Sequence, residues 1–173
     1  ENYVDMGVTA INEPLNPLQA GAQQVKVQVE NMGTDTITAY TIDWTINGVP
    51  QTSFTGVTPI PPCGTSIEVT VGSYTFANAP ADISAWSSTV ADNDSSNDTT
   101  MVSLCPGMSG TYTVDATSAS SATNFQSFAD LIKSLNGCGI AGAITVDVVA
   151  GSGPYNEQVI FTNFPGLSNT NSI

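Results

Sequence analysis

The chain has 173 residues, of which 15 are Asp or Glu, two are Lys or Arg and none is His, so its formal net charge is −13. Lys26 and Lys133 are the only side-chain cations, too few to bind a nucleic-acid backbone or an anionic membrane surface. Without His, the chain contains no Ser-His-Asp triad, no His general base and no His-ligated metal.

The first part of the chain is predicted to form strands. Apolar and polar residues alternate at 25–29, 40–46 and 67–71, the period of strands with one buried face. Asn47-Gly48 is the expected two-residue hairpin turn. A two-sheet sandwich with Trp44 in its core is expected from seven strands, at 3–11, 22–30, 37–46, 50–56, 65–72, 82–90 and 98–104.

The same region resembles a known family. The residues that carry the resemblance are 25–31 with Gly33, the run Ile42-Asp43-Trp44-Thr45-Ile46-Asn47-Gly48, the run 83–86, and the Asn and Asp residues of 92–99. Over about 4–105 they are similar to CARDB-type, cell-adhesion-related immunoglobulin-like domains of bacterial surface proteins. The resemblance implies that 1–105 is one immunoglobulin-like β-sandwich domain.

From residue 109 the pattern changes. A short strand is expected at 110–114, followed by an amphipathic helix at 125–135, where apolar residues recur at steps of three and four. Thr123 or Asn124 is the expected N-cap, Asn136-Gly137 the expected end, and Lys133 is expected in the last turn. Further strands are expected at 143–149 and 159–161.

This order of elements resembles the N-terminal cap of right-handed parallel β-helix proteins of the pectin-lyase-like type. The carriers are Phe125 and Phe128, the strand at 144–146, and the run Gly153-Pro154-Tyr155-Asn156-Glu157-Gln158-Val159. The stretches 110–113 and 166–173 resemble large bacterial surface proteins exported by the type IX secretion system. The resemblance implies that 106–173 is a small α/β segment that starts a β-helix. Catalytic residues of such enzymes lie on later rungs, so none is carried over.

An acidic run at 92–98 is the sharpest polar cluster. Asp92, Asp94 and Asp98 stand at alternating positions, like the first ligands of a calcium loop. Asn97 stands where an EF-hand needs Gly, and Ser103 where it needs a bidentate Glu, which excludes an EF-hand. Two interpretations stay open: an Asx-rich turn, or a structural Ca²⁺ held by these three Asp residues. No other cofactor is expected.

Two Asp-Thr pairs resemble the O-glycosylation signal of bacteria with type IX secretion. They are Asp35-Thr36-Ile37 and Asp98-Thr99-Thr100. The resemblance implies Thr36 and Thr99 as candidate glycosylation sites.

The three cysteines are Cys63, Cys105 and Cys138, and no Cys-x-x-Cys pair suggests a zinc or redox site. The strand order puts Cys63 and Cys105 at opposite ends of the sandwich, roughly 20 Å apart at ~3.3 Å per residue. A disulfide needs Cα atoms within about 7 Å. The predicted bond is therefore Cys105–Cys138, between the linker and the end of the helix, with Cys63 free.

No catalytic machinery is expected. Asp147 and Glu157 are the candidate acid and base, but Asp147 alternates outward and no second carboxylate is placed near Glu157. Sugar stacking and half-burial on strand faces both stay open for four aromatic residues: Tyr74, Phe76, Trp86 and Tyr155.

These features predict a non-enzymatic structural or adhesive module of a large secreted bacterial cell-surface protein. The chain begins at Glu1 without an apolar leader, and we expect it to be part of a longer secreted polypeptide. The expected partners are neighbouring domains or subunits of a surface assembly, and surface glycans; nucleic acid and membrane insertion are not expected. The alternative is an accessory domain and cap of a β-helix polysaccharide lyase or esterase, which carboxylates and Arg on later rungs would favour.

Overall fold

The structure is a computed structural model that describes residues 3–89 and 92–173. The chain divides into two units: the first comprises Glu1–Leu15 and Ala20–Leu104, the second Asn16–Gln19 and Cys105–Ile173. The sequence predicted a single division between 105 and 106. Residues 16–19 belong to the second unit although they precede this boundary, because their backbone pairs with its start. Leu18 N donates to Cys105 O at 2.9 Å, and Leu18 forms a β-bridge with Pro106.

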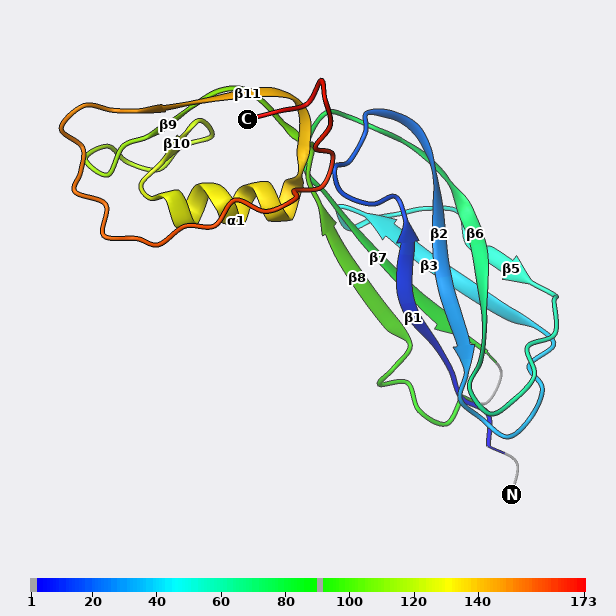
Figure 1. Ribbon diagram of the computed structural model, residues 1–173. Coiled ribbons are helices and arrows are strands. Elements are labelled where there is room, and N and C mark those ends of the chain that lie inside the picture. The colour runs from blue at the N-terminus through cyan, green and yellow to red at the C-terminus, as the bar shows by residue number, and fades with distance from the viewer. Residues whose placement is uncertain (1–2, 90–91) are drawn as a thin grey trace. The chain divides into compact units, whose positions relative to one another are not determined.

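The first unit is an immunoglobulin-like β-sandwich of two antiparallel sheets, as the sequence predicted (Figure 1). One sheet has the order β1-β2-β6, formed by Met6–Glu13, Gly21–Asn31 and Thr65–Phe76. The other has the order β4-β3-β7-β8, formed by Val49–Pro50, Tyr40–Ile46, Ala81–Ser88 and Thr99–Leu104. A short β5, Phe54–Gly56, also pairs with β3.

The core of the first unit lies between the two sheets. The alternation seen in the sequence turns the apolar residues of each strand inward, where they are buried: Val25, Val27 and Val29 from β2, and Ile42, Trp44 and Ile46 from β3. Trp44 is 3% exposed, and its indole N–H donates to Thr52 O at 2.9 Å. The prediction that Trp44 fills this core is confirmed.

Strand boundaries differ from the prediction in detail. The Asn47-Gly48 turn forms as expected, with φ of 51° and 76°, both positive as a type I′ turn requires, and joins β3 to β4. The strand expected at 50–56 is split into β4 and β5. β6 continues to Phe76, past the expected end at 72, because β2 pairs with it along its whole length. Residue 90, the expected end of β7, lies outside the described residues.

The second unit is built on a small parallel sheet. Its strands are β9 (Met108–Val114), β10 (Asn124–Phe125) and β11 (Ile140–Val148), in the order β10-β9-β11. Among the described residues, none of 149–173 forms a strand, so the strand expected at 159–161 is absent. No helix in the described ranges is both long and apolar enough to cross a membrane.

The helix begins three residues later than predicted. α1 spans Phe128–Cys138, its N-cap is Ser127, and its C-cap is Gly139 with a φ of 74°. The reason lies outside the local pattern: Asn124 and Phe125 pair with β9 and are therefore extended. As a result, Lys133 lies in the middle of the helix and not in its last turn.

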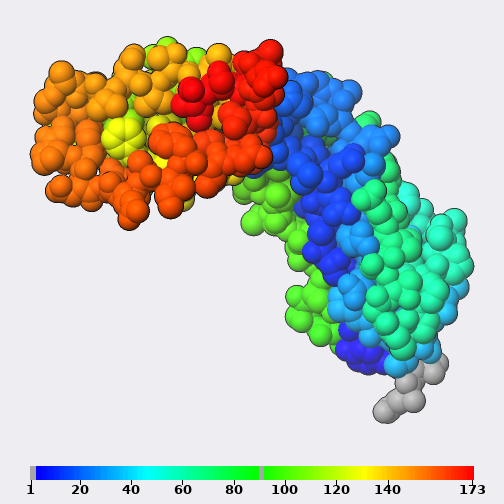
Figure 2. Space-filling model, viewed as in Figure 1, coloured from blue at the N-terminus to red at the C-terminus, as the bar shows by residue number. Residues whose placement is uncertain are grey.

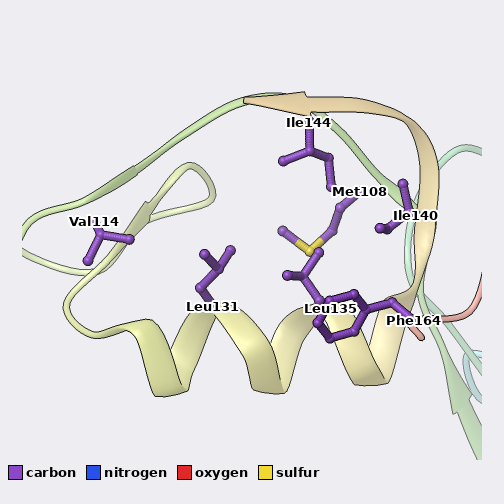
Figure 3. Close-up of a cluster of buried hydrophobic side chains, with 7 residues drawn as sticks. All are labelled: Met108, Val114, Leu131, Leu135, Ile140, Ile144 and Phe164. Atoms are coloured by element: carbon purple, nitrogen blue, oxygen red, sulfur yellow. The ribbon is translucent and has the colours of Figure 1, made fainter. Parts of the chain in front are cut away.

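Seven buried apolar side chains form the core of the second unit. Leu131 and Leu135 point from α1 toward Met108 of β9 and Ile144 of β11 (Figure 3). Phe128 and Ile132 are only partly buried at the edge of this core. The remaining buried members are Val114, Ile140 and Phe164.

Candidate functional site

The acidic run of the first unit forms a turn held by its own carboxylates. Asp92 accepts hydrogen bonds from the backbone N–H of Met6 at 3.3 Å and of Asp94 at 3.1 Å. Asp94 accepts from the N–H and hydroxyl of Ser96 at 3.0 and 2.6 Å. Asp98 accepts from the Ser87 hydroxyl at 3.4 Å. These are the bonds of an Asx-rich turn.

The electrostatics of this turn differ from one carboxyl to the next. Burial, and then the charge of Asp92, raises the pKa of Asp98, whereas the hydrogen bonds from Ser96 lower the pKa of Asp94. Within 3–89 and 92–173, no group of three or more acidic, Cys or His side chains is placed to hold a metal ion. The hydrogen bonds are those of the Asx-turn interpretation; a structural Ca²⁺ at Asp92, Asp94 and Asp98 stays a prediction.

A disulfide fastens the C-terminal end of α1 in the second unit. Cys105 and Cys138 are bonded, with Cα atoms 5.2 Å apart. Beside them, the Asn16 side-chain amide donates to Gly137 O at 2.7 Å, and its Oδ1 accepts from Cys105 N at 2.9 Å. The bonded pair is the one expected from the strand order, and Cys63 is exposed and free.

The N-terminal end of α1 is fastened by a carboxylate from the following segment. Glu157 accepts from the backbone N–H of Phe128 at 3.2 Å and of Ala129 at 2.8 Å. Free N–H groups and the helix dipole make this end a site for negative charge. Glu157 therefore caps a helix, and Asp147, the other carboxylate weighed as an acid or base, is exposed on β11.

One edge of β11 is largely open. β9 pairs with β11 on one side. On the other, Ile140 N donates to Pro165 O and Ile144 N to Ser172 O, each at 2.7 Å, but no strand of the described residues runs there. The backbone of β11 beyond Ile144 therefore presents a short edge that a further parallel strand could pair with.

An apolar groove lies in the segment that follows β11. Its volume is about 550 Å³, and it is lined by Phe161, Thr162, Phe164, Leu167, Ser168, Ser172 and Ile173. The segment forms much of the visible face of this unit (Figure 2, orange to red). Ile160 and Phe161 are 68% and 53% exposed. We call the open edge of β11 together with this groove the open face; exposed apolar surface of this kind marks a contact site.

The four aromatic residues considered for sugar stacking have different environments. Phe76 is buried, and Tyr74 packs edge-on against it with centroids 4.9 Å apart. Tyr155 packs against Phe128 at 5.3 Å and shares a 2.6 Å hydrogen bond with Ser152. Trp86 is half-buried on a sheet face and, unlike the other three, has no aromatic or hydrogen-bonding partner among the described residues.

The two candidate glycosylation sites, Thr36 and Thr99, are both exposed. Thr36 precedes the bridge between Ile37 and Ile60, and Thr99 begins β8. Their exposure is compatible with modification, which stays a prediction.

Sequence reasoning missed a polar turn that follows β9. Asp115 is buried and accepts from the N–H and hydroxyl of Thr117 at 2.9 and 2.6 Å and from the Ser118 hydroxyl at 2.6 Å. The hydrogen bonds from Ser118 and Thr117 lower the pKa of Asp115. The run Asp115-Ala116-Thr117-Ser118 is an Asx-turn signal that could have revealed it.

No protein family model and no curated protein matches this chain. Solved structures are similar to it at low identity. A domain of a presumed cell surface protein from Methanosarcina acetivorans is 15% identical, with 60% of this chain and 91% of that chain covered and a TM-score of 0.48.

The CARDB domain of a Pyrococcus furiosus protein is also similar. Its solution structure is 17% identical, covering 61% of this chain and 96% of its own, with a TM-score of 0.47. Its crystal structure in complex with di-metal ions is 18% identical, covering 60% and 93%, with a TM-score of 0.46. The immunoglobulin-like assignment of the first unit accordingly rests on its own sheet topology.

Proposed function

We propose that the chain is a non-enzymatic structural and adhesive module of a secreted bacterial cell-surface protein. In this proposal the first unit is a CARDB-type adhesion domain, and the second is the N-terminal cap of a right-handed parallel β-helix. The residue patterns at 110–113 and 166–173 support a parent protein exported by the type IX secretion system.

The observation that carries the proposal is the parallel pairing of β11 on β9. Residues Ile144–Val148 pair one-to-one with Gly110–Val114, and α1 covers one face of the sheet. A parallel sheet grows by adding a strand to its free edge, and β11 presents such an edge next to an apolar groove. A following rung would pair with this edge and cover the groove.

The two candidate catalytic carboxylates support a structural role. Glu157 is bonded to the first turn of α1, and Asp147 is exposed on the sheet. A general acid and base must reach the same reacting group, which a carboxylate held on a helix end is poorly placed to do. Their positions are those of a capping residue and a solvated strand residue.

The test is amide hydrogen exchange on the present chain and on a version that continues past Ile173 into the parent polypeptide. We expect the outer-edge amides of Val146 and Val148 to exchange rapidly in the present chain and to become protected in the longer one. A dye that binds exposed apolar surface should bind the open face only in the shorter chain.

The edge strand β6 of the first unit supplies the control, because the proposal predicts no change in its exchange. If the added residues fold but leave the β11 amides unprotected, the second unit is not a β-helix cap.

A further inference from the structure

A tryptophan lies on the outer face of the five-stranded sheet. Its neighbours Ala85 and Ser87 on β7 are buried, so strand alternation turns Trp86 to the opposite, solvent side. Trp86 is half-buried, and its indole N–H makes no hydrogen bond within the described part of the chain. The part of the ring that stays uncovered faces solvent on this side of the sheet and is available to a ligand.

Short polar side chains flank this ring. Trp86 pairs with Asp43 on β3 and with Thr99 on β8. Directly paired residues have Cβ atoms roughly 4.5–5.5 Å apart, so a carboxylate and a hydroxyl lie on either side of the indole. The Asp43 carboxylate also accepts a short hydrogen bond from the Ser53 hydroxyl, which holds it in place.

The next row of the sheet carries three hydroxyls. Thr41 pairs with Thr55 on β5 and with Ser88 on β7, two positions along the strand from Asp43 and Trp86. This row lies about 7 Å from the Asp43–Trp86 row, because a strand rises about 3.3 Å per residue. A ligand longer than one sugar ring would span both rows.

A hollow adjoins this hydroxyl row. Its volume is about 270 Å³, and Thr55, Thr41 and Ser88 line it together with Tyr40. Tyr40 is 3% exposed, and its buried hydroxyl has no hydrogen-bond partner among residues 3–89 and 92–173. Because Tyr40 lies on the buried side of β3, opposite Thr41, its hydroxyl is closed to the hollow, and the polar groups offered there are the hydroxyls of Thr41, Thr55 and Ser88.

Charge selects the class of ligand. Asp43 is the acidic group beside Trp86, and neither lysine lies on this face: Lys26 is on β2, bound to Glu13 at 3.0 Å, and Lys133 is in the second unit. Anionic polysaccharides would be repelled. A neutral sugar suits the site, because its C–H face packs on an aromatic ring and its hydroxyls bond to carboxylate and hydroxyl groups.

We propose that the outer face of the five-stranded sheet binds a neutral glycan, with one sugar ring stacked on Trp86 and hydroxyls bonded to Asp43 and to the row of Thr55, Thr41 and Ser88. The inference rests on the adhesive part of the proposed function and names its ligand class. It does not depend on the open face of the second unit.

The experiment follows the two indole N–H signals by NMR while the chain is titrated with cellohexaose, xylohexaose, mannohexaose and an acidic control, hexagalacturonate. We expect at least one neutral hexasaccharide to shift the Trp86 signal saturably and to leave the Trp44 signal in place. Trp86→Ala should weaken binding by about tenfold or more, as for a central stacking residue. Asp43→Asn should weaken it severalfold.

Tyr74→Ala is the matched control, because it removes a half-buried aromatic side chain from the other sheet. It should leave the affinity unchanged. If Trp86→Ala loses its dispersed spectrum, Trp86→Leu supplies a folded variant without the aromatic face. The proposal is overturned if no neutral hexasaccharide shifts the Trp86 signal at millimolar concentrations, if Tyr74→Ala weakens binding as much, or if only hexagalacturonate binds. None of these outcomes bears on β11 exchange, so they leave the cap proposal standing.

Discussion

The two units reach stability by different routes. In the first, long antiparallel strands present apolar residues on alternate positions, and two sheets bury them against each other without covalent help. In the second, seven buried side chains are supplemented by a disulfide and by side-chain hydrogen bonds at both ends of α1. The difference shows that the small core of the second unit is supplemented by links that the larger two-sheet core does without.

The same difference appears in the exposed surface. Six of the eleven large apolar side chains that the structure exposes lie between Val148 and Ile173. The first unit, although longer, exposes its apolar residues singly. Exposed apolar surface is therefore concentrated in the C-terminal segment of the second unit.

The largest expected effect is on the sandwich core. Trp44→Ala removes a buried indole and should cost the first unit roughly 3–5 kcal/mol of unfolding free energy, measured by urea denaturation. Trp86→Ala removes a half-buried ring from the outer face and should cost clearly less, about 1 kcal/mol. Equal losses from the two variants would contradict the assignment of inner and outer faces.

Loss of the disulfide should affect only the second unit. Replacing Cys105 and Cys138 by Ser opens a loop with a sequence separation of 33 residues, which corresponds to roughly 3–4 kcal/mol by loop-closure entropy. Thermal unfolding followed by amide signals of α1 and β11 would measure it. Cys63→Ser serves as the control, and a comparable loss there would show that the free thiol has a structural role.

A smaller effect is expected at the other end of α1. Glu157→Ala leaves two backbone N–H groups of the first turn unpaired and should cost about 1 kcal/mol. Hydrogen exchange in α1 would report the change. Asp147→Ala removes an exposed carboxylate from the same unit and should leave the exchange as it was; if both variants behave alike, Glu157 is not a cap.

The smallest effect is a pH dependence of opposite sign at two carboxyls, Asp115 of the second unit and Asp98 of the first. The lowered pKa of Asp115 adds stability above the usual Asp pKa, and this is lost as the pH falls through the lowered value. The raised pKa of Asp98 costs stability at high pH, and this is recovered as the pH falls through the raised value.

Urea unfolding of each unit between about pH 6 and pH 2 would separate the two carboxyls. Asp115→Asn should reduce the fall in the unfolding free energy of the second unit as the pH is lowered. Asp98→Asn should remove its contribution to the rise in the unfolding free energy of the first unit over the same range. If the two variants change the pH dependence of the unfolding free energy in the same direction, the assignment is wrong; Asp94 stays in place in both, so its lowered pKa does not affect this comparison.

Local patterns predicted most of the first unit and part of the second. Alternation over 40–46 fixes which side of β3 is buried, and hence Trp44, without knowledge of the partner strand. The start of α1 could not be read this way, because pairing with β9 holds Asn124 and Phe125 extended. The strand expected at 159–161 failed for the converse reason: its apolar residues have no neighbouring strand in the described residues.

The roles of candidate site residues were likewise harder to predict where their partners lie far away in the sequence. The Cys105–Cys138 bond could be inferred because strand direction separates Cys63 from Cys105. The role of Glu157 could not, because its partners lie 28 and 29 residues earlier and only the fold brings them together. The sequence analysis set aside a catalytic role for Glu157 but could not show that it caps α1.

The position of residues 16–19 limits where genetic recombination can separate the two units. They belong to the second unit but lie in the loop between β1 and β2 of the first. A genetic exchange at residue 105 would therefore deliver a second unit without the Asn16 amide bonded to Gly137 and without the Leu18 backbone bonded to Cys105. The two units should consequently recombine as one block, with crossover points outside the pair rather than between them.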